Sequence, residues 1–81
     1  MAVLARLDGI VIRMLIDRTF GVHLHAFFGE AEMVMALNPV RVIQGDLPAE
    51  ARASALDWAH AHERSVLRNT RWGVFPLLPV R

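Results

Sequence analysis

The sequence predicts an α+β fold: an antiparallel meander of four to five short strands, one long C-terminal helix packed on one sheet face, and an extended tail containing prolines. Asp8-Gly9 and Gly29-Glu30 each separate two apolar runs, a pattern typical of hairpins. The span 47–71 is rich in Ala and contains no Gly, which favours a helix. Pro76 and Pro79 then favour an extended chain.

Breaks between the apolar runs set the limits of each element. The strands are expected at residues 3–7, 10–16, 22–28, 31–37 and 40–43, so the meander covers 3–43. Asp46 and Pro48 favour a helix start, because Asp accepts hydrogen bonds from free backbone amides and Pro suits the first turn. We expect the helix over about 47–71, a stop at Trp72-Gly73 and the tail over 73–81, all within a single domain of residues 1–81.

The composition excludes several classes of protein. A chain of 81 residues allows one domain with one small core. Cysteine is absent, which excludes a disulfide framework and a thiolate zinc site and makes a reducing cytoplasm the simplest location. A formal charge of +1 signals no strong attraction to nucleic acid. Charges interrupt the apolar N-terminal segment every few residues, so we expect neither a leader nor a membrane segment.

Alternation along the strands separates the two faces of the predicted sheet, because a two-residue turn fixes the register. One face is wholly apolar and is expected to form the core. It comprises Val3, Ala5, Leu7, Ile10, Ile12, Met14, Ile16, Val22, Leu24, Ala26, Phe28, Ala31, Met33, Met35 and Leu37. A helix stripe at helical spacing is expected to cover it, formed by Ala51, Ala55, Trp58, Ala59, His62 and Val66.

The opposite face, which we call the outer face, mixes apolar side chains with Arg and His. A sheet face that only meets solvent carries mostly polar residues, so this mixture predicts a surface that binds a partner. The partner is expected to be a second copy of the chain or a small cognate protein. The residues expected to contact it are Leu4, Arg6, Val11, Leu15, Phe27 and Val34.

Four residues of the outer face are candidates for catalysis: Arg13, His23, His25 and Glu32. The predicted register places His25 diagonal to Glu32, and pairing with the second strand brings Arg13 near it. Such a group would support metal-free phosphodiester cleavage, as in a ribonuclease, because imidazoles exchange protons and Arg stabilises phosphate charge. Two other interpretations remain open. The histidines fill a half-exposed interface, or His23, His25 and Glu32 bind a metal without a clear fourth ligand.

The helix carries a second row of cations, formed by His60, Arg64, Arg68 and Arg71. The helix dipole favours cations near a helix C-terminus, so the row needs no ligand. Its functional alternative is a track for RNA phosphates or an acidic partner. His62 and Trp58 are expected on the buried side of the helix. No pattern indicates a cofactor.

Three segments resemble a family of small bacterial proteins, the domain of unknown function 4160. They are the hairpin over 5–14, the His-x-His segment with its Gly-Glu turn over 23–30, and the helix over 56–62. The chain departs from the family at 19–22, where members carry a proline-rich run, and at Thr70, where an aromatic is usual. The resemblance implies a toxin-like member of a toxin–antitoxin pair, acting on RNA or on translation.

Overall fold

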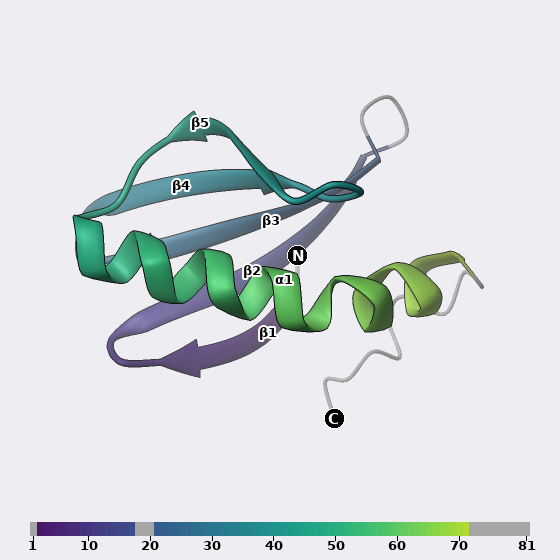
Figure 1. Ribbon diagram of the computed structural model, residues 1–81, viewed down its shortest axis with the longest axis horizontal. Helices are drawn as coiled ribbons and strands as arrows, with labels where there is room; N and C mark the ends of the chain where they lie inside the picture. The colour runs from purple at the N-terminus through teal and green to yellow at the C-terminus, as the bar shows by residue number, and fades with distance from the viewer. Residues whose placement is uncertain (1, 18–20, 72–81) are drawn as a thin grey trace.

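The computed structural model describes residues 2–17 and 21–71, and the side chains of 3–16 and 21–68. Five strands precede one helix (Figure 1). They are β1 (Ala2–Leu7), β2 (Ile10–Asp17), β3 (Gly21–Phe28), β4 (Ala31–Ala36) and β5 (Arg41–Gly45), and the helix is α1 (Ala49–Arg71). The sheet has the order β1-β2-β3-β4-β5 with every neighbouring pair antiparallel. The predicted α+β meander is confirmed; the predicted tail over 73–81 lies outside the described residues.

Two-residue turns hold the first and third hairpins in the predicted register. Asp8 and Gly9 both have positive φ, as the commonest two-residue hairpin turn requires. Their strands pair Leu7 with Ile10, and the Gly29-Glu30 turn pairs Phe28 with Ala31. These registers fix which side chains reach each face of the sheet.

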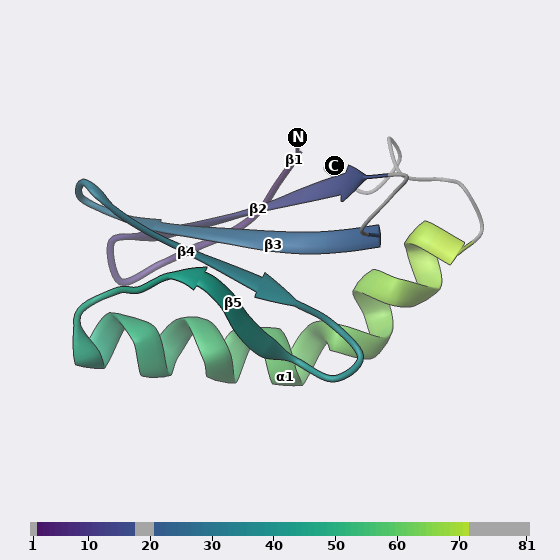
Figure 2. The ribbon, with the colours of Figure 1, turned by 90° about the horizontal axis from the view of Figure 1, so that it is seen from above.

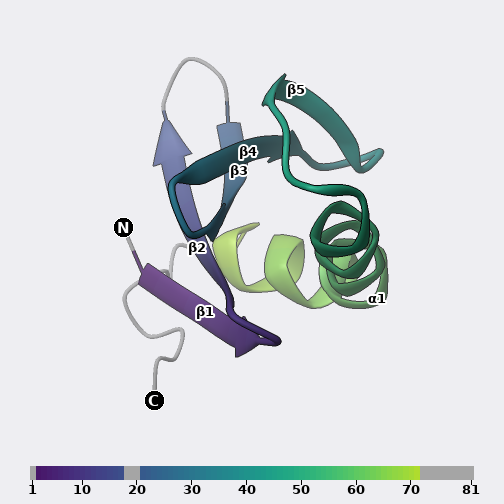
Figure 3. The same ribbon diagram turned by 90° about the vertical axis from the view of Figure 1, so that its left-hand side faces the viewer.

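The core lies between the sheet and α1, which runs across one face (Figure 2) and inside the curve of the sheet (Figure 3). The largest fully buried side chains are those of Ile10, Ile12, Met14, Leu24, Met33 and Met35, all predicted for this face. On the helix, Ala51, Ala55, Ala59 and Val66 are buried as predicted. Their small side chains let the helix backbone approach the sheet.

Three members of the predicted core are exposed instead. Ile16 is 41% exposed at the end of β2, which lies away from α1 (Figure 2). Phe28 is 36% exposed at the opposite end of the sheet, beside the start of the helix. The prediction of a buried His62 is wrong, because its exposed ring stacks on the half-buried Trp58 at 4.2 Å between centroids.

A bulge in β1 corrects the face assignment of two residues. Val3 pairs with Arg13 and Ala5 pairs with Ile12, so Leu4 is an extra residue with no partner of its own. Leu4 therefore packs against the core, although alternation predicts it on the outer face. Val3 moves to the outer face beside Arg13, because its register partner fixes its side.

A second bulge lies in the pairing between β4 and β5. Val34 pairs with Gln44 and Met35 pairs with Val42, which leaves Ile43 as the extra residue, 46% exposed. Gly45 ends the strand at φ +71°, and its Cα lies so close to the backbone of Glu32 that a Cβ would clash with the Glu32 carbonyl oxygen. The Asp46 amide donates to that same oxygen at 3.1 Å. β5 therefore runs two residues past its predicted end and holds the backbone of Glu32 in place.

The helix begins where Asp46 and Pro48 predict. The Leu47 amide donates to Asp46 Oδ1 at 2.9 Å, and Arg52 Nε pairs with that carboxylate at 3.0 Å. Regular helix starts at Ala49, after Pro48. Within the described chain, no helix has the length and apolar content that crossing a membrane requires.

Candidate functional site

Strand pairing arranges the outer face in three rows of side chains that cross the sheet. The first row, Arg6, Val11, Phe27 and Glu32, runs from β1 to β4. The middle row runs from β1 to β5 as Val3, Arg13, His25, Val34 and Gln44. The third row is Leu15, His23, Ala36 and Arg41, from β2 to β5. All four predicted catalytic residues therefore lie on one face.

His25 and Glu32 form the strongest polar contact of this face. The His25 Nδ1–H group donates to Glu32 Oε2 at 2.8 Å, across the diagonal between β3 and β4. The His25 side chain is 15% exposed and that of Glu32 is 45% exposed. The carboxylate thus fixes one tautomer of the ring and leaves Nε2 as the nitrogen that can accept a proton.

Arg13 and Phe27 complete the surroundings of His25. Arg13 is the register partner of His25, as the sequence predicts. Its guanidinium lies 5.5 Å from the centroid of the Phe27 ring, which is within cation–π range, and that ring stacks on His25 at 6.3 Å. Val11, Arg13 and Phe27 line a hollow of about 200 Å³ beside the pair. A cation, an aromatic ring and an oriented imidazole thus share one small area.

His23 lies on the same face but next to a different cavity. It pairs with Leu15 and Ala36, one row away from His25. Two residues along a strand place the side chains of His23 and His25 about 7 Å apart. The cavity beside His23 measures about 580 Å³ and is also lined by Asn38, Arg41 and Ile43. Val22, Leu37 and Leu67, which pack against the core, line it as well, so it lies at the end of the sheet and not on the outer face alone. His23 is therefore placed to act together with His25 on one extended ligand.

The outer face carries more positive charge than the chain as a whole. Among side chains that the structure describes, its three rows contain Arg6, Arg13 and Arg41 against a single carboxylate, Glu32, which is already paired with His25. Most of the remaining carboxylates lie in turns or on the helix. A near-neutral total charge thus conceals a cationic sheet face, which attracts anions.

The predicted partner contacts have different surroundings. Arg6 is exposed, and Val11, Leu15 and Phe27 are half-buried on the outer face. Val34 lies on this face but is 7% exposed between its neighbours, so it offers little surface for contact. Leu4 does not contribute to the outer face, because the β1 bulge makes it pack against the core. The described helix lies on the other side of the sheet from this face (Figure 3).

Sequence reasoning missed Arg41, Gln44 and Val3 as members of the outer face. The run of residues 40–43 is too short to define a face by alternation, and the two bulges invert the pattern beyond them. The available signal for Arg41 was the change from a polar to an apolar residue between Arg41 and Val42. Val42 packs against the core, and Arg41 lies on the opposite face.

The described residues do not form the cluster of ligands that the metal-binding interpretation requires. Within residues 2–17 and 21–71, no three side chains of His, Asp or Glu gather as a metal would require. His25 and Glu32 are paired, and His23 lies in the next row.

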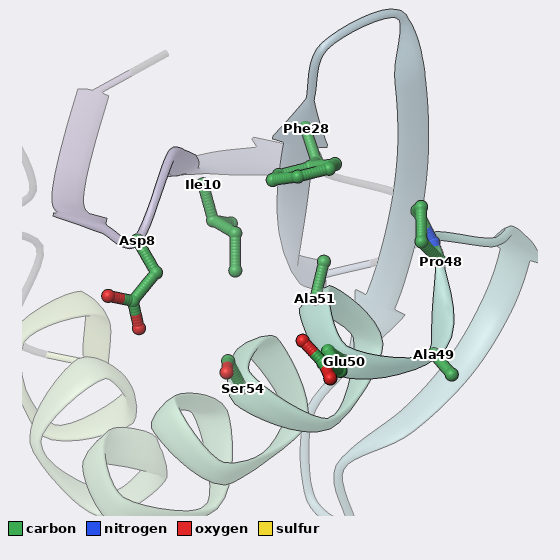
Figure 4. Close-up of a pocket in the computed structure, with 8 residues that line it drawn as sticks. All are labelled: Asp8, Ile10, Phe28, Pro48, Ala49, Glu50, Ala51 and Ser54. Carbon is green, nitrogen blue, oxygen red and sulfur yellow. The ribbon is translucent and has the colours of Figure 1, made fainter.

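A further cavity of about 450 Å³ lies at the other end of the molecule, between the β1–β2 turn and the first turns of α1 (Figure 4). Ile10 and Phe28 form its apolar wall, and the carboxylates of Asp8 and Glu50 lie on either side of Ser54. None of the described residues that line this cavity is His or Arg. Its two carboxylates repel a phosphate, so it does not suit the chemistry of the outer face.

The cation row of the helix is only partly described. His60, Arg64 and Arg68 are exposed on α1, and the side chain of Arg71 lies outside the described residues. α1 packs with its apolar stripe against the sheet, so this row is separated from the outer face by the sheet itself (Figure 2). The two cationic surfaces can therefore be tested independently.

Comparison with known proteins assigns the chain to a family. Residues 9–71 match the family described as Domain of unknown function (DUF4160). This match spans the structure from the β1–β2 turn to the end of α1. Neither a curated protein nor a solved structure matches the chain. The match covers most of the sequence and includes the His25–Glu32 pair, and the chain belongs to the DUF4160 family.

Proposed function

We propose that the protein cleaves single-stranded RNA without a metal, as the toxin-like member of a toxin–antitoxin pair. The observation that carries the proposal is the 2.8 Å contact between His25 and Glu32, beside Arg13 on a cationic face. A carboxylate that orients an imidazole is a common way to prepare a general base.

Each of the four residues has its own role in the proposed reaction. His25 Nε2 takes the proton of a ribose 2′-hydroxyl, and the 2′-oxygen attacks the adjacent phosphorus. The bond from phosphorus to the 5′-oxygen breaks, and protonated His23 gives its proton to that leaving oxygen. A 2′,3′-cyclic phosphate and a free 5′-hydroxyl result. Arg13 stabilises the negative charge that grows on the phosphate oxygens, and Glu32 stabilises the imidazolium formed at His25.

The spacing of the two histidines supports this division of roles. Side chains two residues apart on one strand face the same way, about 7 Å apart, which leaves room for a phosphate between them. The half-buried Phe27 ring beside Arg13 offers a surface on which a base can stack. RNA suits such a site better than DNA, since the 2′-hydroxyl is the nucleophile.

The same face explains how a cognate partner would inhibit the protein. Half-buried Val11, Leu15 and Phe27 surround the candidate catalytic group and are uncovered among the described elements. A small protein that binds these apolar side chains would also block access to His25. Partner binding and catalysis therefore compete for one surface, as a toxin–antitoxin pair requires.

Growth arrest on expression of the protein alone tests the proposal in cells. Wild type is expected to arrest growth, whereas His25→Ala and Glu32→Ala are expected to be harmless at equal protein levels. Glu30→Ala is the matched control, because Glu30 is an exposed carboxylate in the β3–β4 turn. If all four proteins have the same effect on growth, His25 and Glu32 have no catalytic role.

The uncovered apolar residues favour a second candidate function, a non-enzymatic interaction protein that forms a homodimer through the outer face. Sedimentation equilibrium separates this candidate from the first. A dimer that Phe27→Glu converts to a monomer, together with intact RNA in the cleavage assay, would favour it. A wild-type monomer would count against it.

A further inference from the structure

The cavity beside His23 has two side chains that can bind an anion, those of His23 and Arg41, with a small residue between them. His23, Ala36 and Arg41 occupy one row across β3, β4 and β5. Ala36 is 7% exposed and its side chain is a single methyl group. Neighbouring strands are about 4.8 Å apart, so His23 and Arg41 stand about 10 Å apart with only this methyl between them. Two long side chains thus flank an opening of about 580 Å³.

Arg41 has no carboxylate partner within the described chain. Its terminal Nη1 donates to the Pro39 carbonyl oxygen at 3.0 Å, which orients the guanidinium group and leaves other N–H groups for a ligand. The two ion pairs among the described residues belong to His25 with Glu32 and to Arg52 with Asp46. A guanidinium that is oriented but not neutralised is suited to bind a phosphate oxygen.

The other walls of the cavity suit a nucleotide more than a free ion. Ile43 is 46% exposed at the β5 bulge and lines the cavity together with Leu37. These apolar groups lie next to His23 and Arg41, so a ligand that joins a phosphate to a flat or apolar group can contact both kinds of side chain. None of the described residues that line the cavity is acidic, while the Glu63 carboxylate accepts a hydrogen bond from the backbone amide of Asn38 at its edge.

We infer that His23 and Arg41 bind the next phosphate of a single-stranded RNA, adjacent to the phosphate placed between His25 and His23. His25 lies in the middle row, and His23 and Arg41 share the third row, so a strand that crosses from one row to the next places successive phosphates beside them. The inference rests on the proposed function for the identity of the ligand. It makes Arg41 a positioning residue, and it makes a chain with at least two phosphates the substrate.

Binding of a substrate that cannot be cleaved separates this inference from the cleavage reaction. The probe is a 2′-O-methyl oligouridine with three phosphates, and its affinity is measured by fluorescence anisotropy over a range of salt concentrations. Arg41→Gln is expected to weaken binding about three- to tenfold and to lower the slope of log K against log salt by about one. Arg52→Gln, which removes an equal charge at the helix start, is expected to leave both values unchanged.

Four outcomes decide the matter. Equal affinity of Arg41→Gln and Arg52→Gln would overturn the inference. An equal effect of Arg41→Gln on the binding of a polyglutamate peptide would also overturn it, in favour of an acidic protein partner. An Arg41→Lys variant with intermediate affinity would support a guanidinium contact. If the wild type binds the probe through Arg41 but never cleaves RNA, the phosphate site stands and the proposed catalysis fails.

Discussion

At the scale of single residues, the diagonal contact between His25 and Glu32 decides what the outer face can do. A one-residue change of register would place either side chain in the core, so the two hairpin turns that fix the register also create the pair. The contact leaves His25 Nε2 available, and Arg13 lies beside it in the same row. The proposed chemistry depends on these three side chains being held together.

Removal of the Glu32 charge tests the orienting role directly. Glu32→Gln is expected to lower the rate of RNA cleavage about tenfold to a hundredfold, because the amide still contacts Nδ1 but no longer stabilises the imidazolium. His25→Asn is expected to lower it further, by about 10²- to 10⁴-fold. Single-turnover cleavage of a labelled oligoribonucleotide measures both, with Glu30→Gln as the control. A rate for Glu32→Gln equal to the control would show that Glu32 has no role.

The sequence predicts much of this site because it depends on local patterns. Two-residue turns and strict alternation placed Arg13, His25 and Glu32 together, and the structure confirms their proximity. Leu4 and Arg41 could not be placed in the same way. A bulge adds one residue with no signature in the apolar pattern, and it moves every residue beyond it to the other face.

At the scale of elements, small residues set the distance between α1 and the sheet. Ala55 and Ala59 are fully buried against the core, whereas Ala61 is exposed on the same helix. Ala59→Leu is expected to lower the free energy of unfolding by about 1–3 kcal/mol, because extra methylenes have no space there. Ala61→Leu is expected to change it by less than about 0.5 kcal/mol. Urea unfolding followed by circular dichroism gives both values, and equal effects would contradict the packing described here.

The β4–β5 bulge depends on one glycine. Gly45→Ala combines an unfavourable φ with a clash against the backbone of Glu32, and we expect a loss of about 3 kcal/mol or more. Gly29→Ala has the same sign of φ but open space around it, so its cost is expected to be about 1 kcal/mol. Thermal and urea unfolding compare the two. A Gly45→Ala variant as stable as Gly29→Ala would show that the strands are not held as closely as described.

The elements themselves follow from the sequence more closely than their ends do. The helix, the strand order and the turns at 8–9 and 29–30 are those that the apolar runs predict. His62 is the informative failure, because its position fits the helical stripe while its ring can stack on Trp58 and remain in solvent. Helical spacing identifies the apolar face of a helix, but it does not show how much of that face the sheet covers.

At the scale of the whole molecule, charge is unevenly distributed over two surfaces that the sheet separates. The outer face and the row of His60, Arg64 and Arg68 on α1 both could attract RNA, and sequence alone does not choose between them. Arg13→Gln is expected to lower the salt slope of RNA binding by about one, since one phosphate contact is lost. Arg64→Gln is expected to leave the slope unchanged. If Arg64→Gln lowers the slope and Arg13→Gln does not, the RNA-binding surface is on the helix.

Metal-free cleavage of single-stranded RNA is the most direct test of the central proposal. Purified protein is incubated with a labelled oligoribonucleotide in excess EDTA, beside the same oligonucleotide with 2′-deoxyribose throughout. We expect the wild type to cleave only the ribose strand and to leave 2′,3′-cyclic phosphate ends, and His25→Asn to cleave neither. Wild-type protein that leaves the ribose strand intact, or that cuts both strands equally, would contradict the assignment of His25 as the base that activates a 2′-hydroxyl.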